Sequence, residues 1–196
     1  MTQSKIVVIG GGSFGTAIAN ILAENNFPTV LWVRDAQKAA AIQTTRENTT
    51  YLPGLKLDAR LQVSADLASA LFEAAIVFVS VPSKVFRSVV QQMRHFLSPN
   101  AIVVSTAKGI ETGENHHGFW LMSDVLKQEL PNHRMAVLSG PNLAGEIAEK
   151  QLTGTVVASA DAAVCQQVQD CLRSPYFRVY SNNDVYGVEL GGVLKN

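Results

Sequence analysis

The chain lacks an excess of charge of either sign, because 16 Lys and Arg residues balance 16 Asp and Glu residues among its 196 residues. A protein that attracts nucleic acid or an anionic membrane through its overall field needs a net positive charge, so neither partner is expected. Any affinity for phosphate groups must come from a local site. Charged residues make up only 16% of the chain and hydrophobic residues 47%. This composition excludes a disordered chain and supplies the core of one large domain, or of one domain plus part of another.

Cysteine and long apolar runs are also scarce. Cys165 and Cys171 are the only two cysteines, and their spacing points them in different directions on a helix, so we expect buried, reduced thiols rather than a disulfide. The longest apolar stretch, around Ala74–Val79, is too short to span a membrane. The first residues, Met1 to the apolar run at Lys5–Ile9, lack the design of a secretion signal. These absences predict a soluble, cytoplasmic protein without membrane insertion.

What the sequence does contain is an alternation of short β-branched runs with helical patterns. The expected strands cover Ile6–Ile9, Thr29–Val33, Ala75–Val79, Ile102–Ser105, Met135–Leu138, Thr155–Ala158 and Phe177–Tyr180. The expected helices cover Ser13–Glu24, Ala36–Thr45, Ala65–Ala70, Ser83–His95, Phe119–Glu129, Leu143–Glu149 and Ala160–Leu172, and Glu47–Leu61 is expected to be a long loop. The strand runs are continuously apolar, which is typical of strands covered on both faces. The pattern predicts an α/β fold, a Rossmann-like doubly wound and mainly parallel sheet with helices on both faces, in which the directions of the last two strands stay open.

A glycine-rich segment follows the first expected strand directly. Gly10, Gly12 and Gly15 fit G-x-G-x-x-G at a junction of strand and helix, the context that this pattern requires. The first glycine permits a tight turn, the second lets the backbone approach a pyrophosphate, and the third lets the helix pack against the sheet. The phosphates would rest on N–H groups at the positive end of the helix. The segment therefore predicts a site for a nicotinamide dinucleotide, with a ligand-free turn as the alternative.

The end of the second strand bears on which coenzyme is bound. An acid about twenty residues beyond the glycines usually holds the adenosine ribose. Here the strand ends with Arg34 and Asp35. Arg34 suits the 2′-phosphate of NADP, whereas Asp35 either binds the ribose of NAD or only caps the next helix. We therefore expect NADP or NAD, with NADP slightly favoured.

Residues just after the later strands are further candidates, because ligands bind beyond the carboxyl ends of parallel strands. Phe86, one turn into a helix, either lines the nicotinamide pocket or belongs to the core. Lys108 follows the strand Ile102–Ser105 and points either into the ligand crevice or into solvent. The loop Ser139–Asn142 opens a helix and offers backbone N–H groups to an anion.

Two adjacent glycines, Gly191 and Gly192, lie in the last helical pattern. Each costs roughly 1 kcal/mol of helix propensity, so the backbone there has a reason to approach something closely. Packing against another helix explains the glycines but not Lys195, which follows them.

Together these blocks resemble the NAD(P)-dependent sn-glycerol-3-phosphate dehydrogenase family, and its bacterial members most closely. The matching segments are Val8–Ala17, Val81–Ser83, Ala107–Gly109, Ser139–Pro141 and Gly187–Asn196. They follow the family's order along nearly the whole chain, and the last segment is the most specific. The resemblance implies reversible hydride transfer between the coenzyme and dihydroxyacetone phosphate, which gives sn-glycerol 3-phosphate, a precursor of glycerophospholipids.

The resemblance also implies roles for single residues. Coenzyme contacts fall on Ser13, Phe14, Arg34 and Ala144, contacts with both coenzyme and substrate on Lys108, substrate contacts on Gly140, Asn142 and Asn196, and the catalytic lysine on Lys195. Asn142 stands where many bacterial members have Ser or Thr. Chemistry supports the two lysines as catalytic groups, because hydride arriving at a ketone carbon leaves charge on oxygen that an ammonium group stabilises and then protonates. Lys195 is the expected acid, and Lys108 beside it would lower its pKa and help to hold an anionic substrate.

The same resemblance predicts the domain organisation. Residues 1–182 would form the dinucleotide-binding domain. The helical pattern Val185–Asn196, after a cap at Asn183-Asp184, shows no C-terminal signal. We expect residues 183–196 to begin a helix that leads to a C-terminal helical substrate domain absent from this chain.

Two other functions remain open. One is a hydroxyacid or phosphogluconate-type dehydrogenase that also uses a lysine, and the other is a coenzyme-binding fragment without activity of its own. No metal site is expected, because the adjacent His116 and His117 have no third ligand at a convincing spacing. A homodimer is a further possibility that no particular residue supports.

Overall fold

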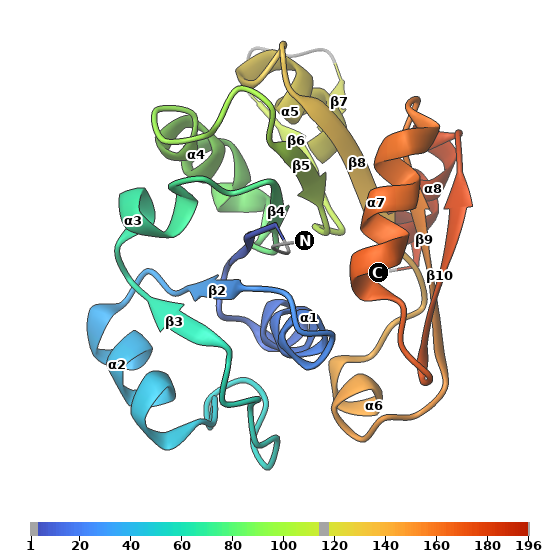
Figure 1. Ribbon diagram of the computed structural model, residues 1–196. Helices are drawn as coiled ribbons and strands as arrows, with labels where there is room; N and C mark the ends of the chain where they lie inside the picture. The colour runs from blue at the N-terminus through green and yellow to red at the C-terminus, as the bar shows by residue number, and fades with distance from the viewer. Residues whose placement is uncertain (1–3, 114–117, 196) are drawn as a thin grey trace.

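The computed structural model describes residues 4–113 and 118–195, and its centre is a single sheet of eight strands (Figure 1). In sheet order these are β10 (Phe177–Asn182), β9 (Thr153–Ala158), β8 (Arg134–Ser139), β5 (Ile102–Ser105), β4 (Ile76–Val79), β1 (Ile6–Ile9), β2 (Thr29–Trp32) and β3 (Gln62–Ser64). All neighbouring pairs are parallel except β8 and β9, so the last two strands run against the others. The predicted fold class is confirmed, and the open question of strand direction is answered.

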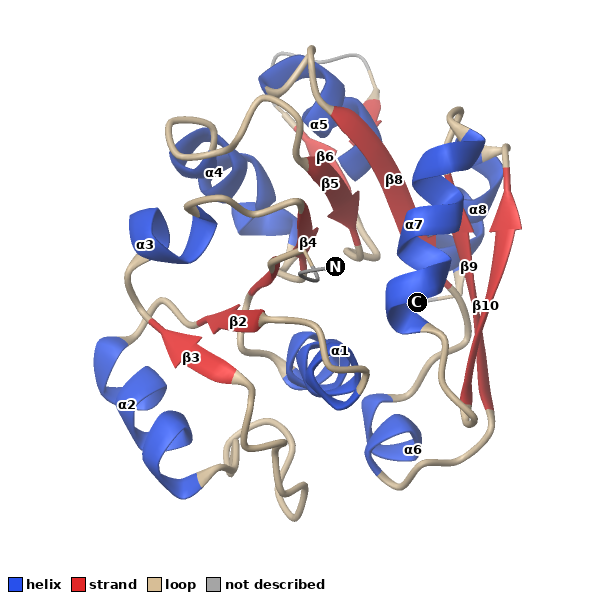
Figure 2. Ribbon diagram, in the orientation of Figure 1, coloured by secondary structure: helices blue, strands red, loops and turns tan. Residues whose placement is uncertain are grey.

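Helices cover both faces of the sheet (Figure 2). One face packs against α1 (Ser13–Glu24), α2 (Ala36–Thr45), α6 (Ala144–Ala148) and α7 (Ala162–Leu172). The other face packs against α3 (Leu67–Leu71), α4 (Ser83–Met93) and α5 (Met122–Glu129). Strand β1 divides its fully buried side chains between the two layers, with Ile6 and Val8 in the first core and Val7 and Ile9 in the second. This division explains why the strand reads as a continuous apolar run.

The last helix, α8 (Val185–Leu194), packs against β8 and β9. Its Glu189 is buried and accepts hydrogen bonds of 3.0 and 3.3 Å from the backbone N–H of Ser123, at the start of α5. Burial raises the pKa of the Glu189 carboxyl above its ordinary value of 4.5. A buried acid on a helix rich in apolar residues and glycine thus joins α8 to α5.

The predicted helix Phe119–Glu129 is partly wrong. Residues Phe119–Leu121 form a strand, β7, which pairs antiparallel with β6 (Ile110–Thr112), and the helix begins at Met122. A short run of bulky apolar residues fits a strand as well as a helix, so its period does not decide between them. The three-residue strands β3 and β6 were not expected either, because segments so short carry no measurable alternation.

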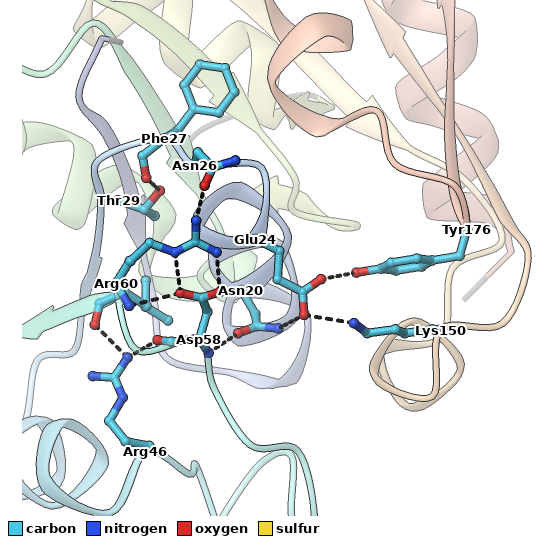
Figure 3. A network of polar contacts seen from close by, with 11 residues as sticks. Asn20, Glu24, Asn26, Phe27, Thr29, Arg46, Asp58, Arg60, Lys150 and Tyr176 are labelled. Atoms are coloured by element: carbon cyan, nitrogen blue, oxygen red, sulfur yellow. Dashed lines mark hydrogen bonds and ion pairs between the residues drawn. The ribbon is translucent and has the colours of Figure 1, made fainter. Parts of the chain in front are cut away.

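The loop after α2 is confirmed, and polar contacts hold it against α1 (Figure 3). The Asn20 Oδ1 atom on α1 accepts a hydrogen bond of 2.8 Å from the Asp58 N–H in the loop. On its other side, Glu24 accepts a hydrogen bond of 2.8 Å from the Tyr176 hydroxyl and pairs with Lys150 at 3.1 Å. Helix α1, which carries the glycine loop at its start, is therefore fixed from two directions.

Both cysteines are buried and free, as expected. Burial raises the pKa of the Cys171 thiol, which keeps it in the unreactive protonated form. Among the described helices, none has the length and apolar character needed to cross a bilayer.

Candidate functional site

The candidate site lies along the carboxyl edge of the four central parallel strands. Strands β1, β4, β5 and β8 are neighbours and run in the same direction, so the residues that follow them meet at one edge. These residues are Gly10, Ser80, Thr106 and Gly140. Ligands of open α/β sheets bind at such an edge, where the order of the strands reverses.

The glycine loop has the geometry that the pattern predicts. Gly10 has a φ of 118°, and a Cβ there would collide with the Ser80 carbonyl oxygen. A Cβ on Gly15 would collide with the Gly10 carbonyl oxygen, so the third glycine lets α1 pack closely. A Cβ on Gly12 would meet nothing within 4 Å. Gly12 also precedes α1 without a side-chain cap. The loop therefore presents an open backbone and the positive end of a helix, which fits a pyrophosphate.

A cavity of about 390 Å³ lies beside this loop, between the ends of β1, β2 and β4. Arg34, Asp35, Lys38 and Tyr51 line it together with the first three glycines. Asp35 caps α2, because its Oδ1 accepts hydrogen bonds from the N–H groups of Gln37 (2.9 Å) and Lys38 (3.1 Å). The capping interpretation of Asp35 is thus confirmed. Arg34 is exposed beside it, which leaves two cations, Arg34 and Lys38, on the wall of this cavity.

A second cavity of about 330 Å³ lies on the other side of the glycine loop. Its lining includes most of the predicted contact residues, namely Gly12, Ser13, Phe14, Gly15, Lys108, Asn142 and Ala144. These residues come from the ends of three strands and are up to 132 positions apart in the sequence, as the numbers of Gly12 and Ala144 give. Both cavities are lined by Gly12 and Ser80, at the switch in strand order where open α/β sheets bind dinucleotides.

Lys108 is directed into this second cavity. Its ammonium group donates a hydrogen bond of 2.8 Å to the Gly140 carbonyl oxygen and lies 5.8 Å from the centre of the Phe14 ring. The pKa of Lys108 is lowered, first by burial and second by the positive charge of Lys195. The positive charge of Lys195 thus lowers the pKa of Lys108. The expectation from sequence was that Lys108 would lower the pKa of Lys195.

Helix α8 approaches this region through Gly192. A Cβ on Gly192 would collide with the Ser139 hydroxyl oxygen and lie 3.8 Å from Cγ of Lys108. The predicted need for a close backbone is therefore explained by packing on the end of β8. Lys195 follows the last residue of this helix and is exposed, whereas Asn196 lies outside the described residues.

Asn142 is buried at the mouth of the second cavity, with 8% of its surface exposed. Its Nδ2 donates a hydrogen bond of 2.7 Å to the Gly154 carbonyl oxygen, which fixes the orientation of the amide because a carbonyl only accepts. The Oδ1 atom has no partner among the described residues. Asn142 therefore offers an acceptor where a hydroxyl group would offer both a donor and an acceptor.

One predicted contact residue is placed elsewhere. Phe86 is fully buried in the core between α4 and the sheet and does not line either cavity. Of its two interpretations, the structure shows the core one, because its position on α4 turns the ring inward. His116 and His117 lie outside the described residues, and no group of three His, Cys, Asp or Glu side chains suited to a metal is found in residues 4–113 and 118–195.

Several site residues were not predicted from sequence. Lys38 and Tyr51 line the first cavity, and Asn48 contacts the glycine loop from the loop after α2. Lys38 could have been found from sequence, because it lies one helical turn beyond the Asp35 cap and so on the same side of the helix start as Arg34 and Asp35. Asn48 and Tyr51 carried none, because nothing local shows that an aperiodic loop folds back onto α1.

Comparison with known proteins gives one consistent result. Residues 5–165 match the sequence profile described as NAD-dependent glycerol-3-phosphate dehydrogenase N-terminus. The chain is 52% identical, over 100% of its length, to the glycerol-3-phosphate dehydrogenase [NAD(P)+] of Alcanivorax borkumensis, and likewise 52% identical to that of Teredinibacter turnerae. It covers 57% of each of these relatives. The crystal structure of glycerol-3-phosphate dehydrogenase from Coxiella burnetii is 31% identical in sequence and superposes on 98% of the chain with a TM-score of 0.91. The chain covers 57% of that protein.

Proposed function

The chain belongs to the NAD-dependent glycerol-3-phosphate dehydrogenase family, and from this premise we propose that it forms the coenzyme-binding part of an enzyme that reduces dihydroxyacetone phosphate to sn-glycerol 3-phosphate. The observation that carries the proposal is the placement of Lys108. Its ammonium donates a hydrogen bond to the Gly140 carbonyl oxygen and lies near the Phe14 ring, and its pKa is lowered in part by the charge of Lys195. This places Lys108 beside the glycine loop, at the carboxyl edge of the sheet. The proposed pyrophosphate site and the lysine proposed to hold the phosphorylated ketone therefore lie at the same edge of the sheet, with Lys195 near enough to lower the pKa of Lys108.

The residues present fit a nicotinamide dinucleotide. The open backbone at Gly12 and the uncapped start of α1 would hold its pyrophosphate, with Ser13 and Phe14 in the first helical turn. Arg34 would hold the adenosine end, where its charge suits the 2′-phosphate of NADP. Ala144 would border the nicotinamide end. NADP is the slightly favoured coenzyme, because Arg34 and Lys38 line the first cavity and the Asp35 carboxylate there is occupied as a helix cap.

The proposed chemistry assigns separate tasks to the protein groups. When bound, the coenzyme supplies the hydride. The Lys195 ammonium stabilises the negative charge that develops on the carbonyl oxygen and donates its proton there. Lys108, already partly desolvated, holds the anionic substrate. Gly140 and Asn142 border the substrate, and in the reverse direction Lys195 accepts the proton.

The chain spans 57% of the length of the relatives it matches, so turnover is proposed for a longer protein. We propose residues 1–182 as the dinucleotide-binding domain and α8 as the lead into a helical substrate domain. The apolar character of α8 supports this, since Tyr186 is 56% and Leu194 77% exposed. The cytoplasm is the proposed location.

Two measurements test the proposal. Calorimetric titration of the chain with NADPH and NADH should give saturable binding. A chain extended to the length of the relatives should then oxidise the reduced coenzyme with dihydroxyacetone phosphate and show no comparable rate with hydroxyacids or phosphogluconate, assayed with the oxidised coenzyme. Turnover of one of the latter substrates alone would replace the proposal with the alternative dehydrogenase class. If the 196-residue chain binds coenzyme but does not turn over dihydroxyacetone phosphate, the result agrees with a coenzyme-binding domain and a separate substrate domain.

A further inference from the structure

The glycine loop is held by a side chain from outside the predicted motif. Asn48, in the loop after α2, is only 3% exposed. Its Nδ2 donates a hydrogen bond of 2.9 Å to the Gly11 carbonyl oxygen and one of 2.8 Å to the Thr16 hydroxyl. One amide group therefore joins the turn after β1 to the first part of α1, and both of its N–H donors are used.

The bond to Gly11 has a consequence for the neighbouring amide. The peptide between Gly11 and Gly12 is trans and planar, so its C=O and N–H point in opposite directions. Because Asn48 holds the Gly11 carbonyl oxygen, the Gly12 N–H is turned away from Asn48. The bond to Thr16, which is fully buried, fixes the first turn of α1 to the same amide.

Asn48 is itself held in place. The backbone carbonyl oxygen of Asn48 accepts hydrogen bonds from the backbone N–H groups of Leu52 (2.9 Å) and Tyr51 (3.3 Å), which form a tight turn. The Ser13 hydroxyl donates a hydrogen bond of 2.6 Å to the Tyr51 carbonyl oxygen, so the same turn contacts the loop a second time. The turn from Asn48 to Leu52 thus contacts the glycine loop at Gly11 and the first turn of α1 at Ser13 and Thr16.

We propose that Asn48 is a positioning residue that fixes the glycine loop in the conformation that receives the coenzyme pyrophosphate. The proposal rests on the proposed function. Asn48 does not line either cavity and acts through the backbone of Gly11 and the start of α1. Its removal therefore weakens binding of ligands that contain a pyrophosphate and spares ligands that occupy only the adenosine end.

The test compares Asn48→Ala and Asn48→Leu with the unchanged chain. Asn48→Leu retains most of the volume without a donor, so it separates the lost hydrogen bonds from a cavity and covers the case in which Asn48→Ala does not fold. Calorimetric titration with NADPH, NADH and ADP-ribose should give dissociation constants about tenfold higher for each folded variant, because the Gly11 carbonyl oxygen and the Thr16 hydroxyl both lose their donor and the loop is no longer fixed. The dissociation constant of adenosine 2′-monophosphate, which has no pyrophosphate, should stay within about twofold.

Asn20→Ala is the matched control. Asn20 is also buried, at 3% exposure, and also ties α1 to the loop after α2, but at Asp58 (Figure 3). It lies in the second half of α1 and not at the glycines that precede the helix. Its melting temperature should fall, as should that of Asn48→Ala, while its coenzyme affinity remains that of the unchanged chain. Equal loss of affinity in Asn20→Ala, unchanged affinity in the Asn48 variants, or a parallel loss for adenosine 2′-monophosphate would overturn the positioning role. Failure of the unchanged chain to bind any dinucleotide would instead refute the proposed function.

Discussion

The ammonium group of Lys108 donates a hydrogen bond of 2.8 Å to the carbonyl oxygen of Gly140 and so joins the loops that follow β5 and β8. These loops come from strands that are neighbours in the sheet. The contact places a partly buried positive charge beside the first turn of α1, with the Phe14 ring 5.8 Å away. The surroundings of the Lys108 charge therefore come from the segments that follow three different strands, β1, β5 and β8.

Replacement of Lys195 by alanine tests the proton donor. In a chain extended to the length of the relatives, Lys195→Ala should lower turnover of dihydroxyacetone phosphate by about 10²- to 10⁴-fold, the usual contribution of a positioned acid. Because Lys195 is exposed at the end of α8 and lines neither cavity, coenzyme affinity should be nearly unchanged. Steady-state kinetics and calorimetry measure the two effects. Turnover retained near the original rate would exclude Lys195 as the donor.

Two glycines of the same motif should respond differently to alanine. A Cβ on Gly12 meets nothing within the protein, so Gly12→Ala should leave the melting temperature nearly unchanged and weaken coenzyme binding by about tenfold or more, because the methyl group occupies the space proposed for the pyrophosphate. A Cβ on Gly15 collides with the Gly10 carbonyl oxygen, so Gly15→Ala should destabilise the fold itself. Thermal unfolding and titration of both variants separate these effects. Equal affinity in Gly12→Ala and the unchanged chain would place the pyrophosphate elsewhere.

The preference for NADP is tested at Arg34. Arg34→Ala should raise the dissociation constant of NADPH about ten- to a hundredfold, the range for a charged hydrogen bond to phosphate, and change that of NADH little. Lys38→Ala is the matched comparison, since it removes the other cation from the same cavity. A larger selective loss in Lys38→Ala would assign the 2′-phosphate to Lys38. Loss of NADH and NADPH affinity to the same extent in Arg34→Ala would contradict a role in selecting between them.

The buried acid of α8 predicts a pH dependence of stability. Burial raises the pKa of Glu189 above 4.5, so the folded state binds more protons than the unfolded state between the two values. The stability that the protonated form contributes is fully present below pH 4.5 and is lost as the pH rises through the raised value. Glu189→Gln lacks this titration, so its free energy of unfolding should increase relative to the original as the pH rises through that range.

Urea unfolding at a series of pH values measures this difference. Glu149→Gln, a change at an exposed acid, serves as the control and should show no such trend. A difference between Glu189→Gln and the original chain that stays constant over the whole series would contradict the raised pKa.

Much of this architecture was predictable from the sequence because its signals are local. The apolar runs of β1, β4 and β5 mark strands covered on both faces, and the glycine spacing marks the turn before α1. What escaped prediction depends on partners far apart in the chain. Asn48 contacts Gly11, 37 positions away, and Glu189 contacts Ser123, 66 positions away. Neither residue type nor periodicity indicates such a pairing.

The site shows the same division. Lys108, Asn142 and Ala144 were expected beyond the carboxyl ends of the strands and line the second cavity there, because each follows a parallel strand or opens the next helix. Phe86 lies at a comparable position but faces the core, since the orientation of α4 rather than its place in the sequence decides which side chains reach the cavity.

The most direct measurement follows the backbone amides of the chain by nuclear magnetic resonance during titration with NADPH or NADH. If the pyrophosphate rests on the start of α1 with a cation beside it, the amide signals of Gly12, Ser13 and Phe14 and the side-chain signals of Lys108 should shift most and saturate together at a stoichiometry of one. Saturable binding that leaves these signals in place and shifts residues at another edge of the sheet would contradict the account.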